Sequence, residues 1–233
     1  MSALVAIAPA ALLALTSWVS ARGGVNREDA LVLHAMLPYL SRTRARGRHR
    51  TCDEVQDLVQ AVKDGEPRAT RTAARTMALH PRLRGFGGLV VPAPRSSEAS
   101  PSLQGLAEEM VRAGVGRGVA SLVRRRIPVP SSRLRRREGL GGLGPAAHAD
   151  SLAVELGGLS PDTPLLLVDD VIVTGATLAG VVSALRAAGH AGPILGAGIA
   201  IAVADTHGNM PVRFCPKKPI SMTVTLQRDE ERI

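Results

Sequence analysis

The sequence predicts an α/β fold in which a mainly parallel, doubly wound sheet is flanked by helices on both faces. Short apolar runs alternate with helix-length segments after residue 81, which is the pattern of repeated strand–helix–strand crossovers. Hydrophobic residues make up 45% of the 233-residue chain but aromatic residues only 2%, so Leu, Val, Ile and Ala must form the core. Such a core suits strands that are buried on both faces. This composition excludes disordered, collagen-like and disulfide-stabilised proteins.

Residues 1–25 form an apolar N-terminal segment. Residues 19–21 have the small side chains of a signal-peptide cleavage site, but no basic stretch precedes the apolar run. Polar residues and a proline also interrupt the run, which is short for a membrane span. We favour a helix docked on the domain or an extension from an upstream start codon, with an export or anchoring segment as the open alternative. We therefore expect a cytoplasmic protein without membrane contact unless residues 3–21 are an anchor.

Residues 26–80 are predicted to form a helical N-terminal region. A helix capped by an asparagine is predicted over 26–37, an amphipathic helix over 53–65 and a third helix over 67–79. The Arg-rich stretch over 42–50 is interpreted as a solvated loop between helices, because the chain has almost no aromatic residues on which bases could stack.

Residues 81–233 are predicted to form the α/β domain. Its strands are predicted over 88–94, 118–123, 164–168 and 193–203, and its helices over 102–113 and 178–188. Between the second and third strands, residues 124–150 are rich in Arg, Gly, Pro and Ser and are predicted to be a flexible, cationic loop. The ligand of such a sheet should lie beyond the carboxyl ends of its strands.

The most informative segment is the strand and turn over residues 165–177. An apolar strand ends in Asp169 and Asp170, and a turn of small and hydroxyl-bearing residues, 174–177, opens the next helix. Small residues allow backbone N–H groups to approach a phosphate, and a helix N-terminus favours negative charge. Paired carboxylates suit the vicinal hydroxyls of a sugar or a Mg²⁺ ion. The segment therefore predicts a site for a ribose 5-phosphate.

This segment resembles the phosphoribosyl diphosphate (PRPP) binding motif of the type I phosphoribosyltransferases, whose fold the resemblance implies for this chain. The resemblance covers residues 89–203, is strongest over 168–177, and is nearest to uncharacterised and competence-protein-like members of the family. It implies that Asp169 and Asp170 are catalytic and hold the ribose hydroxyls, directly or through Mg²⁺. It also implies that the 5-phosphate is bound by Val173, Thr174, Gly175, Ala176 and Thr177.

Two further parts of the resemblance depend on position along the chain. The family has a pyrophosphate loop after its first sheet strand, which implies that Arg95, Ser96 and Ser97 bind the diphosphate. A flexible catalytic loop follows in the family, and its cations neutralise the departing diphosphate. The catalytic candidates in the corresponding loop here, among which the sequence does not choose, are Arg133, Arg135, Arg136 and Arg137.

Two single residues bear on the substrate. In the 6-oxopurine branch of the family an acid at the position of Val173 hydrogen-bonds the purine, so the resemblance disfavours a hypoxanthine–guanine enzyme. No other residue identifies the acceptor. Members of the family bind the acceptor with a variable hood, a subdomain built from flanking segments. His148 is expected to be exposed to solvent, with a contact to substrate as the alternative. The spacing of the histidines and cysteines predicts no structural metal.

These observations predict a Mg²⁺-dependent phosphoribosyltransferase that transfers a phosphoribosyl group between PRPP and a nitrogenous acceptor. The alternative is a catalytically silent PRPP-binding or nucleotide-binding protein with a regulatory or competence-type role. The expected partners are PRPP and an unidentified acceptor, and a homodimer stays open. Nucleic acid is not expected despite the net charge of +9. Only three of the 29 basic residues are lysines, and GC-rich coding explains part of this bias.

Overall fold

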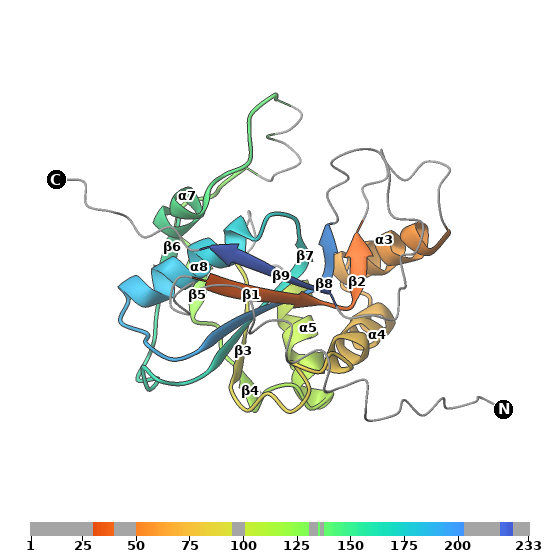
Figure 1. The fold of residues 1–233 in the computed structure, drawn as a ribbon, viewed down its shortest axis with the longest axis horizontal. Helices are drawn as coiled ribbons and strands as arrows, with labels where there is room; N and C mark the ends of the chain where they lie inside the picture. The colour runs from red at the N-terminus through yellow and green to blue at the C-terminus, as the bar shows by residue number, and fades with distance from the viewer. Residues whose placement is uncertain are drawn as a thin grey trace, which may run out of the picture.

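A computed structural model describes residues 30–39, 50–94, 101–130, 135, 138–202 and 220–225 of the chain. Its centre is a seven-stranded sheet with the order β4-β3-β7-β8-β1-β9, in which β2 also pairs with β8 (Figure 1). All strand pairs in this sheet are parallel except β1 with β9. The strands are β1 (Ala30–Ala35), β2 (Leu37–Tyr39), β3 (Leu89–Pro92), β4 (Gly118–Val119), β7 (Leu165–Ile172), β8 (Ile194–Ala202) and β9 (Ile220–Thr225).

Helices cover both faces of the sheet, as predicted. One face packs against α3 (Arg50–Lys63), α4 (Pro67–Ala78) and α5 (Pro101–Arg112). The other packs against α8 (Ala176–Ala187) and against a two-stranded sheet of β5 (Val123–Arg125) and β6 (Leu152–Val154), while α7 (Pro145–Asp150) packs on α8. Figure 1 shows α7 and α8 at the left of the sheet, α3 and α4 at the right, and α5 below its centre. The predicted fold class is therefore confirmed.

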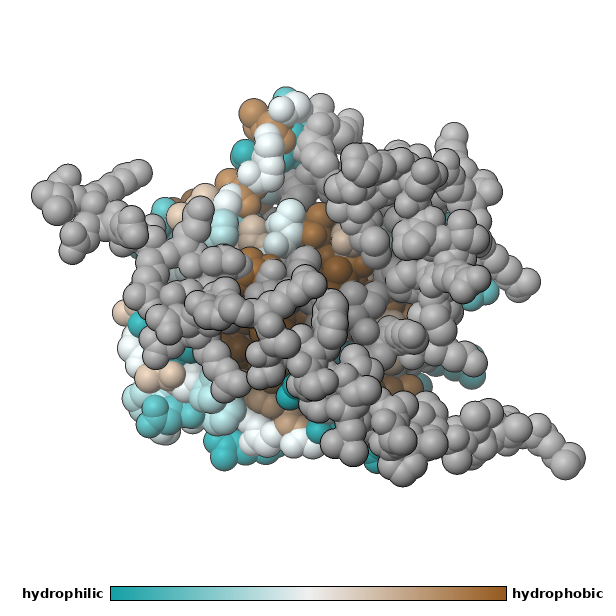
Figure 2. Space-filling view, viewed as in Figure 1, coloured by the Kyte–Doolittle hydropathy of each residue, from teal (hydrophilic) through white to brown (hydrophobic). Residues whose placement is uncertain are grey.

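Strand β7 shows why an uninterrupted apolar run suits this position. Leu166 and Val168 are buried in the core beneath α3 to α5, whereas Leu165 and Leu167 are buried in the core beneath α8. Because successive side chains of a strand point to opposite faces, a strand with a helix layer on each side needs apolar residues at every position. Figure 2 shows hydrophobic residues gathered in the middle of the visible face and hydrophilic residues along its lower edge.

The N-terminal region departs from its prediction. Residues 30–39 form β1 and β2, so the helix predicted over 26–37 was wrong over its described part. Leu31, Leu33 and Ala35 are buried, with the two-residue period of a strand, and β1 pairs with both β8 and β9. A short apolar run fits either period, and these pairings decide it. The two later helices of the region are confirmed as α3 and α4.

The described parts of the segment over 124–150 contain a strand and a helix that were not predicted. The segment begins within β5 and ends with α7, whose first residue, Pro145, has the fixed φ angle that suits a helix start. The C-terminal strand β9 was not predicted at all. None of the helices within the described ranges is long and apolar enough to cross a membrane.

Candidate phosphate-binding site

The site begins at the carboxyl end of β7, where the two predicted carboxylates have different surroundings. Asp169 lines a cavity. Asp170 has its Oδ2 atom 3.4 Å from Nζ of Lys63, the last residue of α3, and its Oδ1 accepts a 2.7 Å hydrogen bond from the backbone N–H of Val171. The structure therefore places Asp169 in the cavity and directs Asp170 towards the helix layer on the other side of the sheet.

The predicted phosphate loop leads from β7 into α8. Gly175 is the N-cap of α8 and has φ 77° and ψ 0°, a left-handed conformation that glycine adopts at little cost. Thr174 accepts a long hydrogen bond of 3.3 Å at Oγ1 from the backbone N–H of Ala176. The first turn of α8 contains no acidic residue that would offset the partial positive charge of the helix N-terminus. This loop has the form of an anion site.

Asp169 and this loop share one cavity of about 270 Å³. The loop contributes all five residues predicted to bind the 5-phosphate, and Val173 among them is 46% exposed. Gly142 and Leu143, from the segment predicted to be a flexible loop, and His148 of α7 complete the wall together with Val171, Ile172 and Leu178. The volume is near the lower end of the range for small-molecule sites, which suits a ligand the size of a sugar phosphate.

His148 is buried rather than exposed, which corrects the favoured expectation for this residue. Its side chain is 8% exposed, and its Nδ1 atom lies 3.0 Å from Nη2 of Arg125 in β5. Nη1 of Arg125 contacts the backbone oxygen of His148 at 3.4 Å and also donates to the hydroxyl of Ser151. Burial and the neighbouring guanidinium lower the pKa of His148 to about 4, so its ring is neutral at pH 7.

The position of His148 depends on a close contact between α7 and α8. A Cβ atom added to Gly180 would lie 2.5 Å from Cβ of His148 and 2.7 Å from the backbone oxygen of Pro145. Only a glycine allows the two helices to approach this closely. The imidazole therefore lies beside the first turns of the helix whose N-terminus forms the loop.

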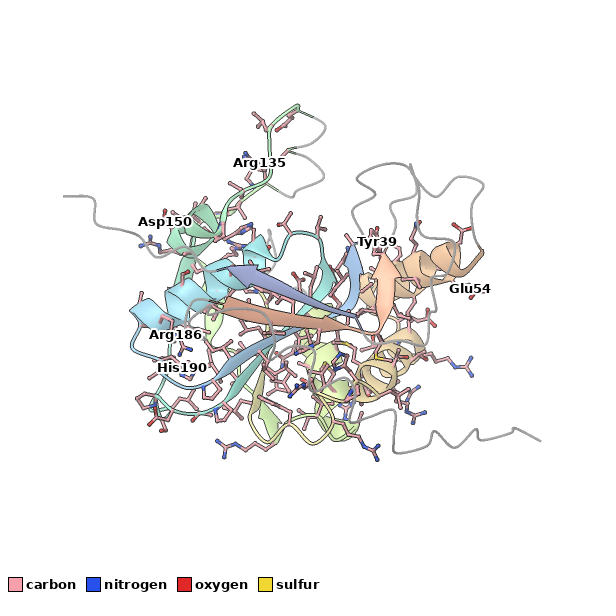
Figure 3. The ribbon with its side chains drawn as sticks, viewed as in Figure 1. Tyr39, Glu54, Arg135, Asp150, Arg186 and His190 are labelled. Atoms are coloured by element: carbon pink, nitrogen blue, oxygen red, sulfur yellow. The ribbon has the colours of Figure 1, made fainter. Side chains whose placement is uncertain are left out.

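The remaining candidates are separated from this cavity or lie outside the described residues. Arg135 donates from Nε to the backbone oxygen of Gly141 at 2.8 Å and does not line the cavity. Figure 3 shows Arg135 on the loop beyond α7, whose last residue is Asp150. The other candidates, Arg95, Ser96, Ser97, Arg133, Arg136 and Arg137, lie outside the described residues.

Sequence reasoning did not select Lys63 or Arg125 as site residues. Lys63 lies more than a hundred residues before Asp170 in the chain. Arg125 reaches His148 because β5 pairs with β6 in antiparallel orientation, with Arg125 opposite Leu152. The sequence carried no signal for that pairing, since both strands have only three residues.

The carboxylates around the cavity decide how the expected Mg²⁺ ion could be held. Among the described residues, no group of three or more His, Cys, Asp and Glu side chains could hold a metal ion. Asp169 is the carboxylate that lines the cavity. Mg²⁺ commonly binds through one or two carboxylates together with the phosphates of a substrate. The donor set therefore fits a Mg²⁺ ion that arrives with a diphosphate, and does not fit an ion held by the protein alone.

No protein-family model and no curated protein sequence matches the chain. Among solved structures it is similar to an allosteric regulatory enzyme of purine biosynthesis, with a TM-score of 0.33 and 19% identity over 55% of this chain, which spans only 25% of that enzyme. It is also similar to adenine phosphoribosyltransferase from Saccharomyces cerevisiae, solved with adenine and an imino-altritol bisphosphate (TM-score 0.37, 14% identity, 60% of this chain and 69% of that one). A third similar structure is adenine phosphoribosyltransferase from Trypanosoma brucei, in complex with AMP, pyrophosphate and ribose-5-phosphate (TM-score 0.34, 13% identity, 66% and 74%).

Proposed function

We propose that the cavity binds the ribose and 5-phosphate of PRPP, and that the protein is a phosphoribosyltransferase with a nitrogenous acceptor. The observation that carries this proposal is the presence of Asp169 and the loop over 173–177 in one cavity. A carboxylate accepts hydrogen bonds from sugar hydroxyls, and the N–H groups of a helix N-terminus donate to a phosphate. A ribose 5-phosphate carries both kinds of group on one small molecule.

The phosphate half of the proposal rests on the electrostatics of the loop. With Gly175 in the left-handed region, the chain turns from β7 directly into α8, and the N–H groups at the start of this helix have no intrahelical acceptor. The cavity-lining threonines, Thr174 and Thr177, add hydroxyl donors. We assign the 5-phosphate to this loop because it concentrates donors and positive potential at one end of the cavity.

The ribose half of the proposal distinguishes the two carboxylates. We assign the direct contact with the ribose hydroxyls to Asp169, which lines the cavity. Oδ1 of Asp169 accepts a 2.8 Å hydrogen bond from the backbone N–H of Asp170, and Oδ1 of Asp170 accepts one from Val171. The two carboxylates differ in position, because Oδ2 of Asp170 faces Lys63 of α3 and not the cavity. We therefore give Asp170 the role of holding the ammonium of Lys63 at the carboxyl end of the sheet, where the diphosphate of PRPP would add negative charge.

The proposed reaction is displacement at C1 of the ribose. The acceptor nitrogen forms a bond to C1 as the bond from C1 to the diphosphate oxygen breaks, and the diphosphate leaves with the electron pair. A proton carried by the acceptor nitrogen passes to water or to the departing diphosphate. The chain positions the ribose, excludes water and neutralises charge. Mg²⁺, when bound through the diphosphate with Asp169 as its carboxylate, supplies further neutralisation of the leaving group. The Arg-rich loop with Arg133 and Arg135, and the predicted pyrophosphate loop over 95–97, are proposed to contact the same diphosphate.

The test is release of diphosphate from PRPP in the presence of Mg²⁺ and a panel of purine, pyrimidine and other nitrogenous acceptors. We compare the wild type with Asp169→Asn and with Asp162→Asn, a control at the opposite end of β7 whose side chain is exposed. We expect acceptor-dependent release by the wild type and the control, and a rate at least about tenfold lower for Asp169→Asn, the least expected for a lost hydrogen bond to a charged group. Equal rates for all three proteins would refute the assignment. Tight PRPP binding without turnover of any acceptor would favour the catalytically silent alternative.

A further inference from the structure

His148 is a buried residue of the cavity to which the proposed function assigns no role. It lines the same cavity as Asp169 and the phosphate loop, and it packs beside the first turns of α8 at Gly180. Its side chain is more than nine-tenths buried. A buried imidazole next to a phosphate loop could bind the phosphate, and whether it can donate a hydrogen bond depends on which ring nitrogen carries the proton.

The contact with Arg125 determines the position of that proton. Nη2 of Arg125 lies 3.0 Å from Nδ1 of His148. A guanidinium has only donors, so this contact is a hydrogen bond only when Nδ1 is unprotonated and accepts. In a neutral imidazole the proton is then on Nε2. Arg125 is itself held in place, because it also donates to the hydroxyl of Ser151, which in turn donates to the backbone oxygen of His148 at 2.6 Å.

The Nε2 atom is left for a ligand. No hydrogen bond within the described residues uses Nε2 of His148. Some histidine nitrogens of these residues are fully buried without a partner, but Nε2 of His148 is not one of them. Nε2 is therefore not sealed inside the protein, and the residue that carries it lines the cavity. The neutral state of the ring at pH 7 agrees with this arrangement, since the pKa of His148 is lowered to about 4.

We infer that His148 donates its Nε2–H to the phosphate group held by the loop over 174–177, and that Arg125 is the positioning residue that fixes the required tautomer. This inference rests on the proposed function, because it takes the ligand to be a phosphorylated ribose. Arg125 also brings a positive charge behind the imidazole. Burial lowers the pKa of this guanidinium, and the charge of Asp169, which lines the cavity, opposes that shift. The phosphate site would thus contain a neutral hydrogen-bond donor, His148, with the positive charge of Arg125 behind it, in addition to the N-terminus of α8.

The first test is spectroscopic and needs no ligand. A long-range ¹H–¹⁵N correlation spectrum of the full chain at pH 7 reports which ring nitrogen of His148 is protonated. We expect the Nε2–H form in the wild type and a mixture of tautomers in Arg125→Met. A predominant Nδ1–H form in the wild type would overturn the inference, because Nδ1 could not then accept from Arg125.

The second test is calorimetric titration of ribose 5-phosphate and of inorganic phosphate into five proteins. These are the wild type, His148→Phe, His148→Gln, Arg125→Met and a control, Arg124→Met, whose exposed side chain pairs with Glu155. Loss of one hydrogen bond to a charged group predicts affinity about 10-fold to 100-fold lower for His148→Phe. We expect partial recovery in His148→Gln, which restores an N–H donor, a weakening in Arg125→Met and no change in the control.

The outcomes separate this inference from the proposed function. Suppose that the wild type binds ribose 5-phosphate, and that His148→Phe binds it equally well and is shown to be folded by its circular dichroism spectrum. The role of His148 is then overturned and the proposed function stands. If the wild type binds neither ribose 5-phosphate nor phosphate, the proposed function fails and the phosphate role of His148 fails with it. A spectrum with the Nε2–H tautomer would then describe only the internal hydrogen bond to Arg125.

Discussion

Replacement of Gly180 by alanine tests the close packing of α7 on α8 that positions His148. The added Cβ would lie 2.5 Å from Cβ of His148, 2.7 Å from the backbone oxygen of Pro145 and 3.0 Å from the backbone nitrogen of Ala149. All three atoms belong to α7 and two are backbone atoms. A flexible side chain could move aside, but here the whole of α7 has to shift away from α8.

The expected magnitude follows from two opposing terms. Alanine is favoured over glycine inside a helix by about 1 kcal/mol. Overpacking of a tightly filled site typically costs about 1–3 kcal/mol. Gly105 in α5 separates these terms, because nothing lies within 4 Å of a Cβ added there. We therefore expect Gly105→Ala to be stabilised by up to about 1 kcal/mol and Gly180→Ala to be neutral or destabilised by up to about 2 kcal/mol.

Urea-induced unfolding of the wild type and both variants, followed by circular dichroism, measures these differences in the free energy of unfolding. The displacement of α7 also predicts weaker binding of ribose 5-phosphate by Gly180→Ala but not by Gly105→Ala. A Gly180→Ala variant as stable as Gly105→Ala, with unchanged ligand affinity, would refute the packing that we describe between α7 and α8.

Three further predictions concern stability and the phosphate loop. The pKa of His34 is lowered to about 4, chiefly by burial, so the folded state takes up this proton later than the unfolded state does. This difference in pKa contributes stability on the order of 3 kcal/mol, which is complete above pH 6.5 and is lost as the pH falls towards 4. Urea unfolding at several pH values should show a smaller loss of stability in His34→Phe than in the wild type. An equal loss in both proteins would contradict the lowered pKa of His34. Lys63→Met should lower the free energy of unfolding by less than about 1 kcal/mol, because Lys63 is 34% exposed and its ion pair with Asp170 is partly screened. A loss of several kcal/mol in urea unfolding would contradict this expectation and show that the ion pair is a major source of stability. Gly175→Ala forces a side chain into the left-handed region at a cost of about 1–2 kcal/mol, so both stability and affinity for inorganic phosphate should fall, and unchanged phosphate affinity would argue against the loop as the phosphate site.

The parts of the fold that the sequence predicted are those with strong, uninterrupted patterns. The apolar run over 164–168 was predicted to be a buried strand and, from Leu165 on, forms the first half of β7, which continues through the paired carboxylates to Ile172. Val55, Val59 and Val62 of α3 are buried at helical spacing, and that helix was predicted close to its observed bounds.

The errors arise where pairing between distant segments decides the local structure. Residues 30–35 could satisfy either period, and only the pairing of β1 with β8 and β9 makes them a strand. The tail strand β9 depends on the same pairing. These contacts join segments more than 150 residues apart, for which local patterns carry no information.

For the site, the sequence predicted the loop over 173–177 and Asp169 but not their neighbours. The burial of His148 follows from a glycine in α8 and an arginine in β5, neither of which belongs to a recognisable motif. The separation of Asp169 from Asp170 follows from the alternation of side chains along β7 and from the position of Lys63 at the end of α3. A motif specifies the backbone of such a site, whereas the surrounding shell depends on tertiary packing.

The measurement that tests the central claim most directly is calorimetric titration of PRPP into the full chain, with and without Mg²⁺, at near-physiological salt. We predict saturable binding with one ligand per chain, strengthened by Mg²⁺ and abolished in Asp169→Asn combined with Asp170→Asn while the circular dichroism spectrum is retained. Absence of binding at millimolar PRPP, or unchanged binding by the double variant, would contradict the assignment of this cavity to a phosphoribosyl ligand.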